Sequence, residues 1–183
     1  MLEKIDLNKK MSKQEYSESL PKIEAELGRL QRECKDLDIP VMIVFEGFGA
    51  SGKGLQIGKL IHSMDPRGFE VHTIKNETEE ERMHPFLWRF WIKTPEKGKI
   101  AVFDGSWYRK VWVDRFEKRT REKELKDDFA SINAFEQQLS EGGTLIIKLF
   151  LDIDQDEQRN VLKNWRKRKR RNGEYSGRQR EKC

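Results

Sequence analysis

The sequence predicts a three-layer α/β/α fold with a mostly parallel sheet, preceded by an N-terminal helix. Three observations support this. Short apolar runs that read as buried strands alternate with longer segments of helical spacing, and a glycine-rich turn joins the first run to the helix after it. Such alternation is typical of parallel sheets with helices on both faces. The length of 183 residues allows one domain with a sizeable core.

The N-terminal helix is predicted from an apolar stripe. Residues 1–16 are charged and aperiodic, and we expect them to form a loose arm. Apolar residues then recur at intervals of three or four, which places them on one side of a helix; they are Leu20, Ile23, Leu27, Leu30, Cys34 and Leu37. The stripe fits a helix that covers its own domain, or one that contacts a second subunit or domain.

Strands and helices alternate along the rest of the chain. We expect strands at residues 41–45, 69–74, 100–104 and 144–151. Helices are expected at residues 53–64, 107–118, 129–139 and 155–168. Another is expected to begin at residues 76–78, which start an acidic first turn. On the first of these helices, four side chains are expected to face inward: Leu55, Ile57, Leu60 and Ile61.

Residues 85–91 are rich in aromatic side chains, with Phe86, Trp88, Phe90 and Trp91 in seven positions. Such a density favours a place in the core. The alternative is the lining of a pocket for a flat ligand such as a base, and the two interpretations are compatible.

The glycine-rich turn carries a phosphate-binding pattern. Gly47, Gly52 and Lys53 fit G-x-x-x-x-G-K, between an expected strand and an expected helix. Glycines let successive backbone N–H groups point toward one anion at a helix N-terminus, and the lysine adds a positive charge. The predicted phosphate-binding residues are Gly47, Gly49, Ala50, Ser51, Gly52, Lys53 and Gly54. Gly54 stands where a serine or threonine is usual, so this position offers no hydroxyl to a metal.

A second candidate group lies where another strand should end. Asp104 follows four apolar residues, a pattern typical of the acid that organises Mg²⁺ in phosphate-loop enzymes. Ligands of doubly wound sheets bind at the carboxyl ends of the strands, so Asp104 is expected to face the loop. Lys110 and Arg115 follow on the next helix, where positive charge can neutralise a phosphoryl group in transfer.

Composition excludes several classes of protein. No apolar run reaches transmembrane length and no signal-peptide core is present, so we expect a cytoplasmic protein without membrane contact. Cys34 and Cys183 are too few for a disulfide framework.

The net charge of +5 is unevenly distributed. Residues 163–183 hold ten basic and two acidic residues, a net +8, which leaves −3 for residues 1–162. A basic stretch is typical of a binding site for a polyanion, either nucleic acid or inorganic polyphosphate, or of a solvent-exposed helix face. Only Trp165 interleaves with the basic residues as a stacking aromatic, so we do not expect nucleic acid as the partner.

Several motifs together resemble one known family. The run FEGFGASGKG at residues 45–54 resembles the phosphate loop of the polyphosphate kinase 2 family, including the glycine after its lysine. FDGSWY at 103–108 is similar to the second motif of that family. DPRGF at 65–69, LWRFW at 87–91 and the stretch 135–151 resemble its polyphosphate:AMP phosphotransferase branch. The resemblance covers roughly residues 21–162.

The resemblance implies a P-loop NTPase-like fold, Mg²⁺ as cofactor, and transfer of phosphate between inorganic polyphosphate and an adenine nucleotide, AMP or ADP. It implies that Lys53 and the loop hold phosphates and that Asp104 organises the metal. It also implies that Lys110 and Arg115 neutralise charge. We therefore expect an N-terminal arm and helix at residues 1–38 and a phosphate-loop kinase-like domain at 39–162. A basic, disordered or incomplete lid or tail is expected at 163–183.

Four positions depart from the pattern of the family. Gly49 stands where an aspartate is usual, Gly105 and Lys110 where arginines are usual, and Asp114 where a glutamate is usual. With these departures the chain resembles a degenerate first unit of a two-unit member, and the stretch after about residue 163, which fits neither the lid nor the final strand of the family, resembles a truncated end. The resemblance implies a homo-oligomer or pairing with a second like unit. The alternatives are a non-catalytic domain that binds polyphosphate, a different phosphate-loop kinase, and a nucleic-acid-binding module.

Overall fold

The computed structural model describes residues 11–116 and 122–171. Its strands are β1 (Val41–Gly47), β2 (Phe69–Thr73), β3 (Ile100–Asp104) and β4 (Leu145–Leu151). Its helices are α1 (Lys13–Asp36), α2 (Lys53–His62), α3 (Glu79–Arg82), α4 (Trp88–Trp91), α5 (Tyr108–Phe116), α6 (Glu122–Glu141) and α7 (Gln155–Arg171). A 3₁₀ turn, Pro66–Gly68, precedes β2.

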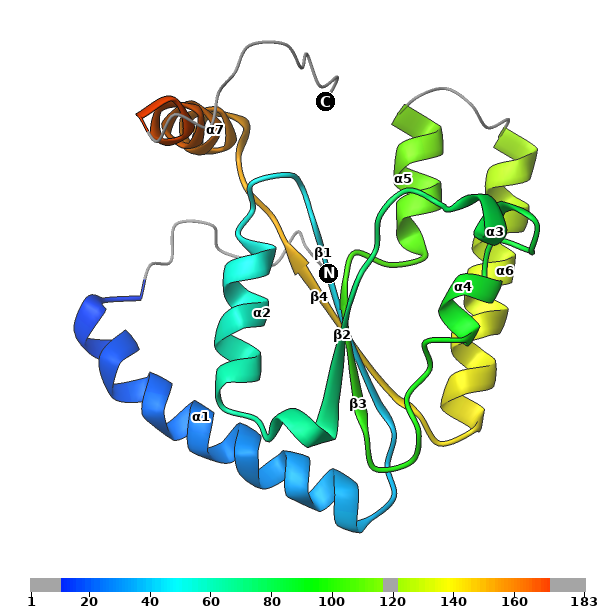
Figure 1. Ribbon diagram of the computed structural model, residues 1–183, viewed down its shortest axis with the longest axis horizontal. Coiled ribbons are helices and arrows are strands. Elements are labelled where there is room, and N and C mark those ends of the chain that lie inside the picture. The colour runs from blue at the N-terminus through cyan, green and yellow to red at the C-terminus, as the bar shows by residue number, and fades with distance from the viewer. Residues whose placement is uncertain (1–10, 117–121, 172–183) are drawn as a thin grey trace.

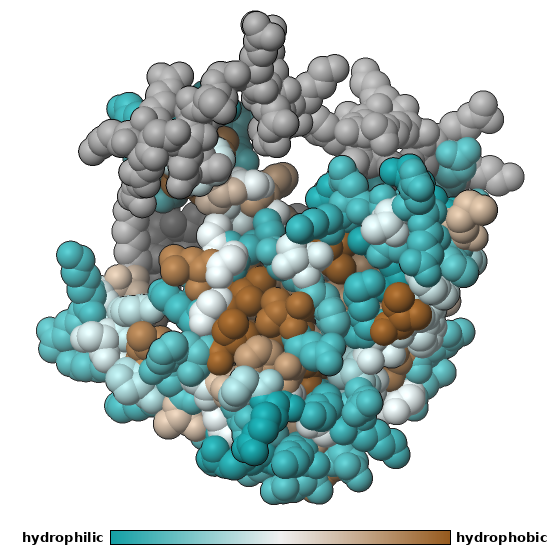
Figure 2. All heavy atoms as spheres, in the orientation of Figure 1, coloured by the Kyte–Doolittle hydropathy of each residue, from teal (hydrophilic) through white to brown (hydrophobic). Residues whose placement is uncertain are grey.

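The described strands form one sheet in the order β2-β3-β1-β4, and every neighbouring pair is parallel. Helices α1 and α2 lie on one side of this sheet and α3 to α6 on the other (Figure 1). Figure 2 shows apolar side chains toward the middle of the same view, where the sheet lies, and mostly hydrophilic side chains on the helices around it. The predicted three-layer architecture with its N-terminal helix is confirmed.

Side-chain alternation along β1 supplies both halves of the core. Val41, Ile43 and Phe45 pack with Ile57 of α2, on one face of the sheet. Met42 and Val44 point to the other face, where they join a cluster that includes Phe103, Trp107, Ile132 and Phe135. Because each fully buried large apolar side chain contributes about 1.5–3 kcal/mol, these two clusters hold the central strand in place.

Helix α1 begins earlier than the apolar stripe predicts. The expectation of a loose arm up to residue 16 is wrong from Lys13 onward, and residues 1–10 lie outside the described part of the chain. Ser12 caps the helix: its hydroxyl accepts a hydrogen bond from the Glu15 amide, and its own amide donates to the Glu15 carboxylate. Polar capping of this kind leaves no trace in apolar periodicity.

The C-terminal half of α1 is attached to its own domain. The buried Gln31 amide donates to the Asp65 carbonyl at 2.9 Å and accepts from the Asp65 amide at 2.7 Å. Ile23, Leu30 and Leu37 from the predicted stripe remain exposed. Helix α1 therefore packs on its own domain, which was the first alternative, although three apolar residues of the stripe stay exposed.

On α2, the inward face is smaller than expected. Ile57 is buried and Leu60 and Ile61 pack against the same cluster, whereas Leu55 is 65% exposed. The expectation for Leu55 was wrong because it lies two residues before Ile57, and two residues on a helix point in nearly opposite directions.

The aromatic segment packs largely as predicted. Phe90 is buried, with its ring edge-on to Trp107 at 5.7 Å, and Trp91 lies edge-on to Phe135 at 4.8 Å. Among the later helices, α6 begins at Glu122, ahead of the expected 129, and α7 continues to Arg171. Residues 117–121 and 172–183, including the expected disordered end, lie outside the described part of the chain.

Candidate functional site

The glycine-rich turn folds as a loop that closes on its own lysine. It runs from the end of β1 to the start of α2, where Lys53 is the first helical residue. The Lys53 ammonium donates hydrogen bonds to the Gly47 carbonyl at 2.7 Å and to the Phe48 carbonyl at 3.3 Å. The loop thus surrounds a positive charge at a helix N-terminus, which is the arrangement that favours an anion.

The conformation of the loop explains part of its composition. Gly47 has a φ of +141°, and a Cβ there would lie 2.2 Å from the Leu151 carbonyl oxygen. Gly52 caps α2 at a φ of +90°, and Ala50 adopts a φ of +68°. Gly47 and Gly52 are therefore required by the backbone, whereas a Cβ on Gly54 would meet no atom of the described structure within 4 Å.

Ser51 supplies an additional polar group inside the loop. Its hydroxyl oxygen is buried, and within the described residues no hydrogen-bond partner satisfies it. A buried hydroxyl without a partner costs about 1–3 kcal/mol. An oxygen-rich ligand such as phosphate would satisfy it, so Ser51 fits the phosphate-binding role predicted for it.

Asp104 lies beside the loop. Strands β1 and β3 are neighbours, with Phe45 opposite Asp104, and the Gly105 amide donates to the Phe45 carbonyl at 2.9 Å. Alternation puts Asp104 on the same face as Val102, the face that α2 covers. The predicted juxtaposition of the strand-terminal acid and the phosphate loop at one edge of the sheet is present.

The donor set at this edge suits a hard cation that shares its ligands with a substrate. Within the described residues no three His, Cys, Asp or Glu side chains gather as a complete metal site. Mg²⁺ commonly binds through one or two carboxylates and completes its shell with phosphate oxygens and water. A single half-buried carboxylate, Asp104, beside a phosphate loop fits that mode.

The two predicted cations on α5 are placed differently from the loop lysine. The Lys110 ammonium lies 2.8 Å from the Asp128 carboxylate and 4.1 Å from the centre of the Phe86 ring. Its charge is therefore already partnered by α6. Arg115 belongs to α5, but its side chain lies outside the described part of the structure.

Gly105, where the family pattern has arginine, has a φ of +76°. A glycine adopts this conformation without strain, whereas a residue with a Cβ does so at a cost. The positive φ at position 105 therefore suits the glycine of this chain better than a residue with a side chain.

A charged cluster that sequence reasoning missed joins the start of α5, α6 and β4. The Glu136 carboxylate accepts hydrogen bonds from the Trp107 indole at 3.0 Å, the Tyr108 hydroxyl at 2.8 Å and the Lys148 ammonium at 2.8 Å. Burial and the bond to Glu136 raise the pKa of Tyr108. Burial opposes the charge of Lys148, but its bonds to Glu136 and Tyr108 outweigh this, and its pKa is raised.

A second missed contact orders the turn after β3. The buried Ser106 hydroxyl donates to the Glu46 carboxylate at 2.5 Å and accepts from the Tyr108 amide at 3.2 Å. A signal for both contacts existed in the sequence. Glu46 and Lys148 are single charged residues inside apolar strands, and such charges usually have buried partners.

Helix α7 also touches the loop. The Gln158 side-chain amide donates to the Gly49 carbonyl at 2.8 Å. This bond connects the first turn of α7 to the loop. The expected lid would begin with this helix.

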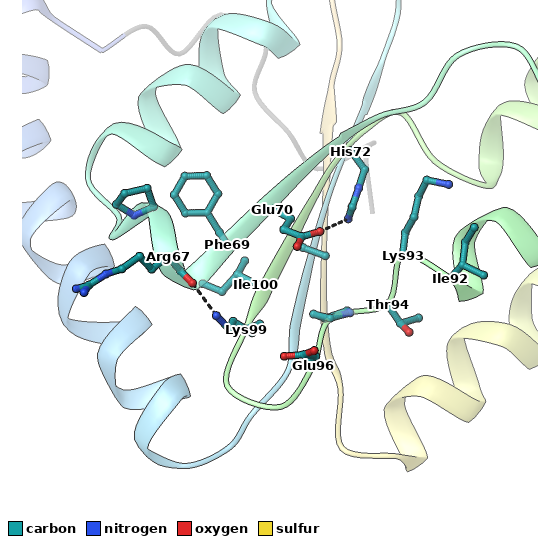
Figure 3. A pocket seen from close by; sticks show the side chains of 13 residues that line it. Arg67, Phe69, Glu70, His72, Ile92, Lys93, Thr94, Glu96, Lys99 and Ile100 are labelled. Atoms are coloured by element: carbon teal, nitrogen blue, oxygen red, sulfur yellow. Dashed lines mark hydrogen bonds and ion pairs between the residues drawn. The ribbon is translucent and has the colours of Figure 1, made fainter.

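A separate cavity lies at the opposite end of the sheet (Figure 3). Its volume is about 560 Å³, and its lining includes Glu70, His72, Lys93 and Lys99. Lys99 donates to the Arg67 carbonyl at 2.7 Å, and His72 lies 3.7 Å from Glu70 (Figure 3). The lining strands contribute mainly their first residues, and ligands of parallel sheets bind at the carboxyl ends. We therefore assign the phosphate-binding site to the loop and not to this cavity.

None of the described helices is both long and apolar enough to cross a membrane.

Comparison with known proteins links these features to one family. A model described as polyphosphate kinase 2 matches residues 10–175. The polyphosphate:AMP phosphotransferase of Pseudomonas syringae pv. tomato is 38% identical over 158 residues, which cover 86% of this chain and 32% of that protein. The protein of the same description from Acinetobacter johnsonii is 41% identical, over 73% of this chain and 29% of its own length.

Solved structures agree with the sequence comparison. A putative polyphosphate kinase 2 from Pseudomonas aeruginosa superposes with a TM-score of 0.85 at 37% identity, covering 91% of this chain and 36% of that chain. Polyphosphate kinase 2 from Arthrobacter aurescens gives a TM-score of 0.84 at 30% identity, covering 90% and 61%. The chain thus spans about one third of the length of the polyphosphate:AMP phosphotransferases that it matches.

Proposed function

The chain belongs to the polyphosphate kinase 2 family, and on this premise we propose that it transfers a phosphoryl group between inorganic polyphosphate and AMP or ADP. The observation that carries the proposal is the position of the loop lysine. The Lys53 ammonium lies within the loop, 2.7 Å from Gly47, and the strand that ends in Asp104 pairs with the strand that leads into this loop.

In this proposal the loop holds the polyanion. The backbone amides of residues 49, 50 and 52–54, at the N-terminus of α2, donate to phosphate oxygens, because the Ser51 amide is already bonded to the Phe48 carbonyl. The Ser51 hydroxyl donates to another phosphate oxygen, and Lys53 contributes charge. The Lys53 ammonium now bonds to two carbonyls, and a bound phosphate would compete with them for it. A phosphate oxygen carries negative charge that a carbonyl lacks, so the ammonium gains a charge–charge attraction and the phosphate is favoured.

Asp104 is the residue that would hold Mg²⁺, which when bound offsets negative charge on the phosphate oxygens. Lys110 and Arg115 remain our candidates for neutralising the transferring group. For Lys110 this role requires its ammonium to exchange the Asp128 carboxylate for a phosphate oxygen. Because the Lys110 side chain is 36% exposed, a phosphate oxygen can approach its ammonium from the solvent side.

A second candidate function is binding of polyphosphate without turnover. One observation favours it: Gly49, Gly54 and Gly105 leave the site with few groups to position a metal, and the described residues contain no cluster of three metal ligands. The same loop and Lys53 would serve this function, because it requires an anion pocket but no organised metal.

A coupled assay separates the two functions. Purified chain is incubated with polyphosphate, Mg²⁺ and either AMP or ADP, and formation of the phosphorylated nucleotide is followed. The transferase proposal expects turnover that falls roughly 100-fold or more in Lys53→Ala, by analogy with the loss of one charge-stabilising donor. Lys59→Ala removes a second lysine of the same helix, one that is bonded to the Tyr16 hydroxyl of α1 and not to the loop; it is the matched control and should keep full activity.

Each result has a distinct meaning. Turnover that persists unchanged in Lys53→Ala contradicts the proposed role of the loop. Tight binding of polyphosphate without turnover supports the second candidate function. Transfer from ATP to a small acceptor without polyphosphate would instead identify a different phosphate-loop kinase.

Pairing with a second like unit is also part of the proposal. Strand β4 forms an edge of the described sheet, and Leu145, Ile147 and Leu149 on it are exposed. The longer relatives have room for another unit, because this chain spans 32% of the Pseudomonas syringae protein. Sedimentation of the purified chain tests pairing: a single monomeric species at micromolar concentration would count against a homo-oligomer.

A further inference from the structure

A narrow slot lies beside α5, at the carboxyl ends of β1 and β4. Its volume is about 190 Å³, and aromatic side chains dominate its lining: Tyr108 and Trp112 from α5 and Phe150 from β4. Glu46 and Lys148 supply the charged groups at its walls. Trp112 is 52% exposed and Phe150 is 45% exposed, so two large rings face an open space. The roles proposed above use none of these rings.

The slot adjoins the phosphate loop. Glu46 immediately precedes Gly47, the first residue of the loop pattern. Phe48, within the loop, packs edge-on against Phe150 with the ring centres 6.0 Å apart. Both features also share one end of the sheet, since Val44, Glu46, Lys148 and Phe150 come from paired positions of β1 and β4. A ligand held by the loop can therefore extend into the slot.

The charged groups of the slot are fixed in place. Lys148 bonds to the Glu136 carboxylate at 2.8 Å and to the Tyr108 hydroxyl at 3.2 Å, and Tyr108 bonds to the same carboxylate. Glu46 is held by the Ser106 hydroxyl at 2.5 Å. A mostly apolar pocket with a few positioned polar groups is the usual character of a small-molecule site.

The size of the slot limits what it can hold. Pockets that enclose whole drug-sized ligands measure about 300–1,000 Å³, and this slot is smaller. It suits one flat ring system. Aromatic walls bind such a ring by stacking, and stacking does not depend on which base it is. An exocyclic amino group on such a ring could donate to the Glu46 carboxylate, which accepts hydrogen bonds.

We propose that this slot binds the base of the nucleotide, stacked on Trp112 and Phe150, while its phosphates reach the loop. The proposal rests on the nucleotide-dependent function proposed above and adds to it the residues that recognise the nucleoside. It assigns base recognition to the space between α5 and β4, and leaves the aromatic segment at residues 85–91 to the core.

The first test uses the unmodified chain and two ligands that differ only by the base. Binding of AMP and of ribose 5-phosphate is measured by calorimetry in the presence of Mg²⁺. Stacking of a base contributes a factor of between about 5 and about 140 in affinity, so AMP should bind more tightly by a factor in this range. Equal affinities for the two ligands would overturn the proposal.

The second test locates the base. Trp112→Ala and Phe150→Ala should each weaken AMP binding by a similar factor. Trp112→Ala should do so without changing the affinity for tripolyphosphate, whereas Phe150 also packs against Phe48 of the loop. Phe129→Ala removes an aromatic ring of comparable exposure from α6, outside the slot, and should leave AMP binding unchanged. Trp112→Phe keeps a ring and should restore most of the affinity. Loss of AMP binding in the Phe129 variant as well, or in neither slot variant, contradicts the proposal.

The tripolyphosphate measurement separates this proposal from the proposed function. If the chain binds tripolyphosphate and AMP but both slot variants keep the affinity for AMP, the slot assignment is wrong and the function stands. If the chain binds neither ligand, both fail. If Trp112→Ala leaves AMP binding intact and abolishes self-association, the slot is a protein contact and the proposal is overturned.

Discussion

The ammonium of Lys53 lies 2.7 Å from the carbonyl oxygen of Gly47, so the last residue of the G-x-x-x-x-G-K pattern is bonded to the first. The bond places a positive charge inside the ring of loop atoms and next to the N-terminus of α2. The lysine side chain is thus positioned before any phosphate arrives, and its role can be separated from folding.

Lys53→Ala should change stability little. The ammonium has two carbonyl partners, one partly buried and one exposed, and a hydrogen bond from a charged group contributes about 1.5–3 kcal/mol, less where water can replace it. We expect the free energy of unfolding in urea to fall by about 2 kcal/mol or less, while phosphate transfer is lost. A fall of more than about 3 kcal/mol would instead make Lys53 a structural residue.

Gly47→Ala and Gly54→Ala should act in opposite directions. A methyl group on Gly47 meets the Leu151 carbonyl at 2.2 Å and adds a side chain at a φ of +141°, so we expect a loss of at least about 2 kcal/mol. Gly54 has open space and lies in α2, where alanine is preferred by up to about 1 kcal/mol. Thermal unfolding of both variants checks this. Equal effects of the two substitutions would show that the close approach of the loop to β4 is absent.

Glu136→Ala should be among the more damaging single changes. The carboxylate is 15% exposed and accepts hydrogen bonds from Trp107, Tyr108 and Lys148, which lose their shared partner when it is removed. The Trp107 indole and the Tyr108 hydroxyl would each be left without this partner, at about 1–3 kcal/mol per group, so we expect a loss of about 3 kcal/mol. The Lys148 contact adds little, because that side chain is 47% exposed. Glu141→Ala, on the exposed end of the same helix, is the matched control and should stay within about 0.5 kcal/mol. Urea unfolding of the two variants should separate them, and similar values would refute the structural role of the cluster.

The Tyr108 hydroxyl should make stability fall at alkaline pH. Burial and Glu136 raise its pKa in the folded state above the ordinary value of 10.0. Above pH 10 the folded chain therefore keeps a proton that the unfolded chain has lost, so the contribution of Tyr108 to stability decreases as pH rises through this range. The difference in unfolding free energy between the natural chain and Tyr108→Phe should shrink from pH 9 to pH 11. A constant or growing difference would contradict the assignment.

Much of the fold follows from local sequence. Three of the four described strands contain a short apolar run, and β2 is the exception. The loop between β1 and α2 carries glycines at positions that the backbone requires, Gly47 and Gly52. Asp104 could be placed beside this loop because the ends of parallel strands share one edge of a sheet. These predictions depend on the spacing of apolar residues and on the positions of glycines and acids relative to the strands, and both can be read directly from a sequence.

The contacts between distant side chains could not be predicted in the same way. Lys110 is paired with Asp128, eighteen positions later, across the junction between two helices. Glu136 on α6 and Lys148 on β4 meet only because α6 packs against the sheet. The start of α1 was a different case, since the S-x-x-E pattern at residues 12–15 is a capping signal that apolar periodicity does not detect.

The most direct test of the account is whether the loop binds a short phosphate chain. Tripolyphosphate is titrated by calorimetry into the natural chain, Lys53→Ala and Lys59→Ala at one fixed salt concentration. If the loop is the anion site, binding should weaken roughly tenfold or more in Lys53→Ala, about 1.4 kcal/mol, and stay unchanged in Lys59→Ala. Equal binding by all three proteins would place the anion outside the loop and would contradict the account.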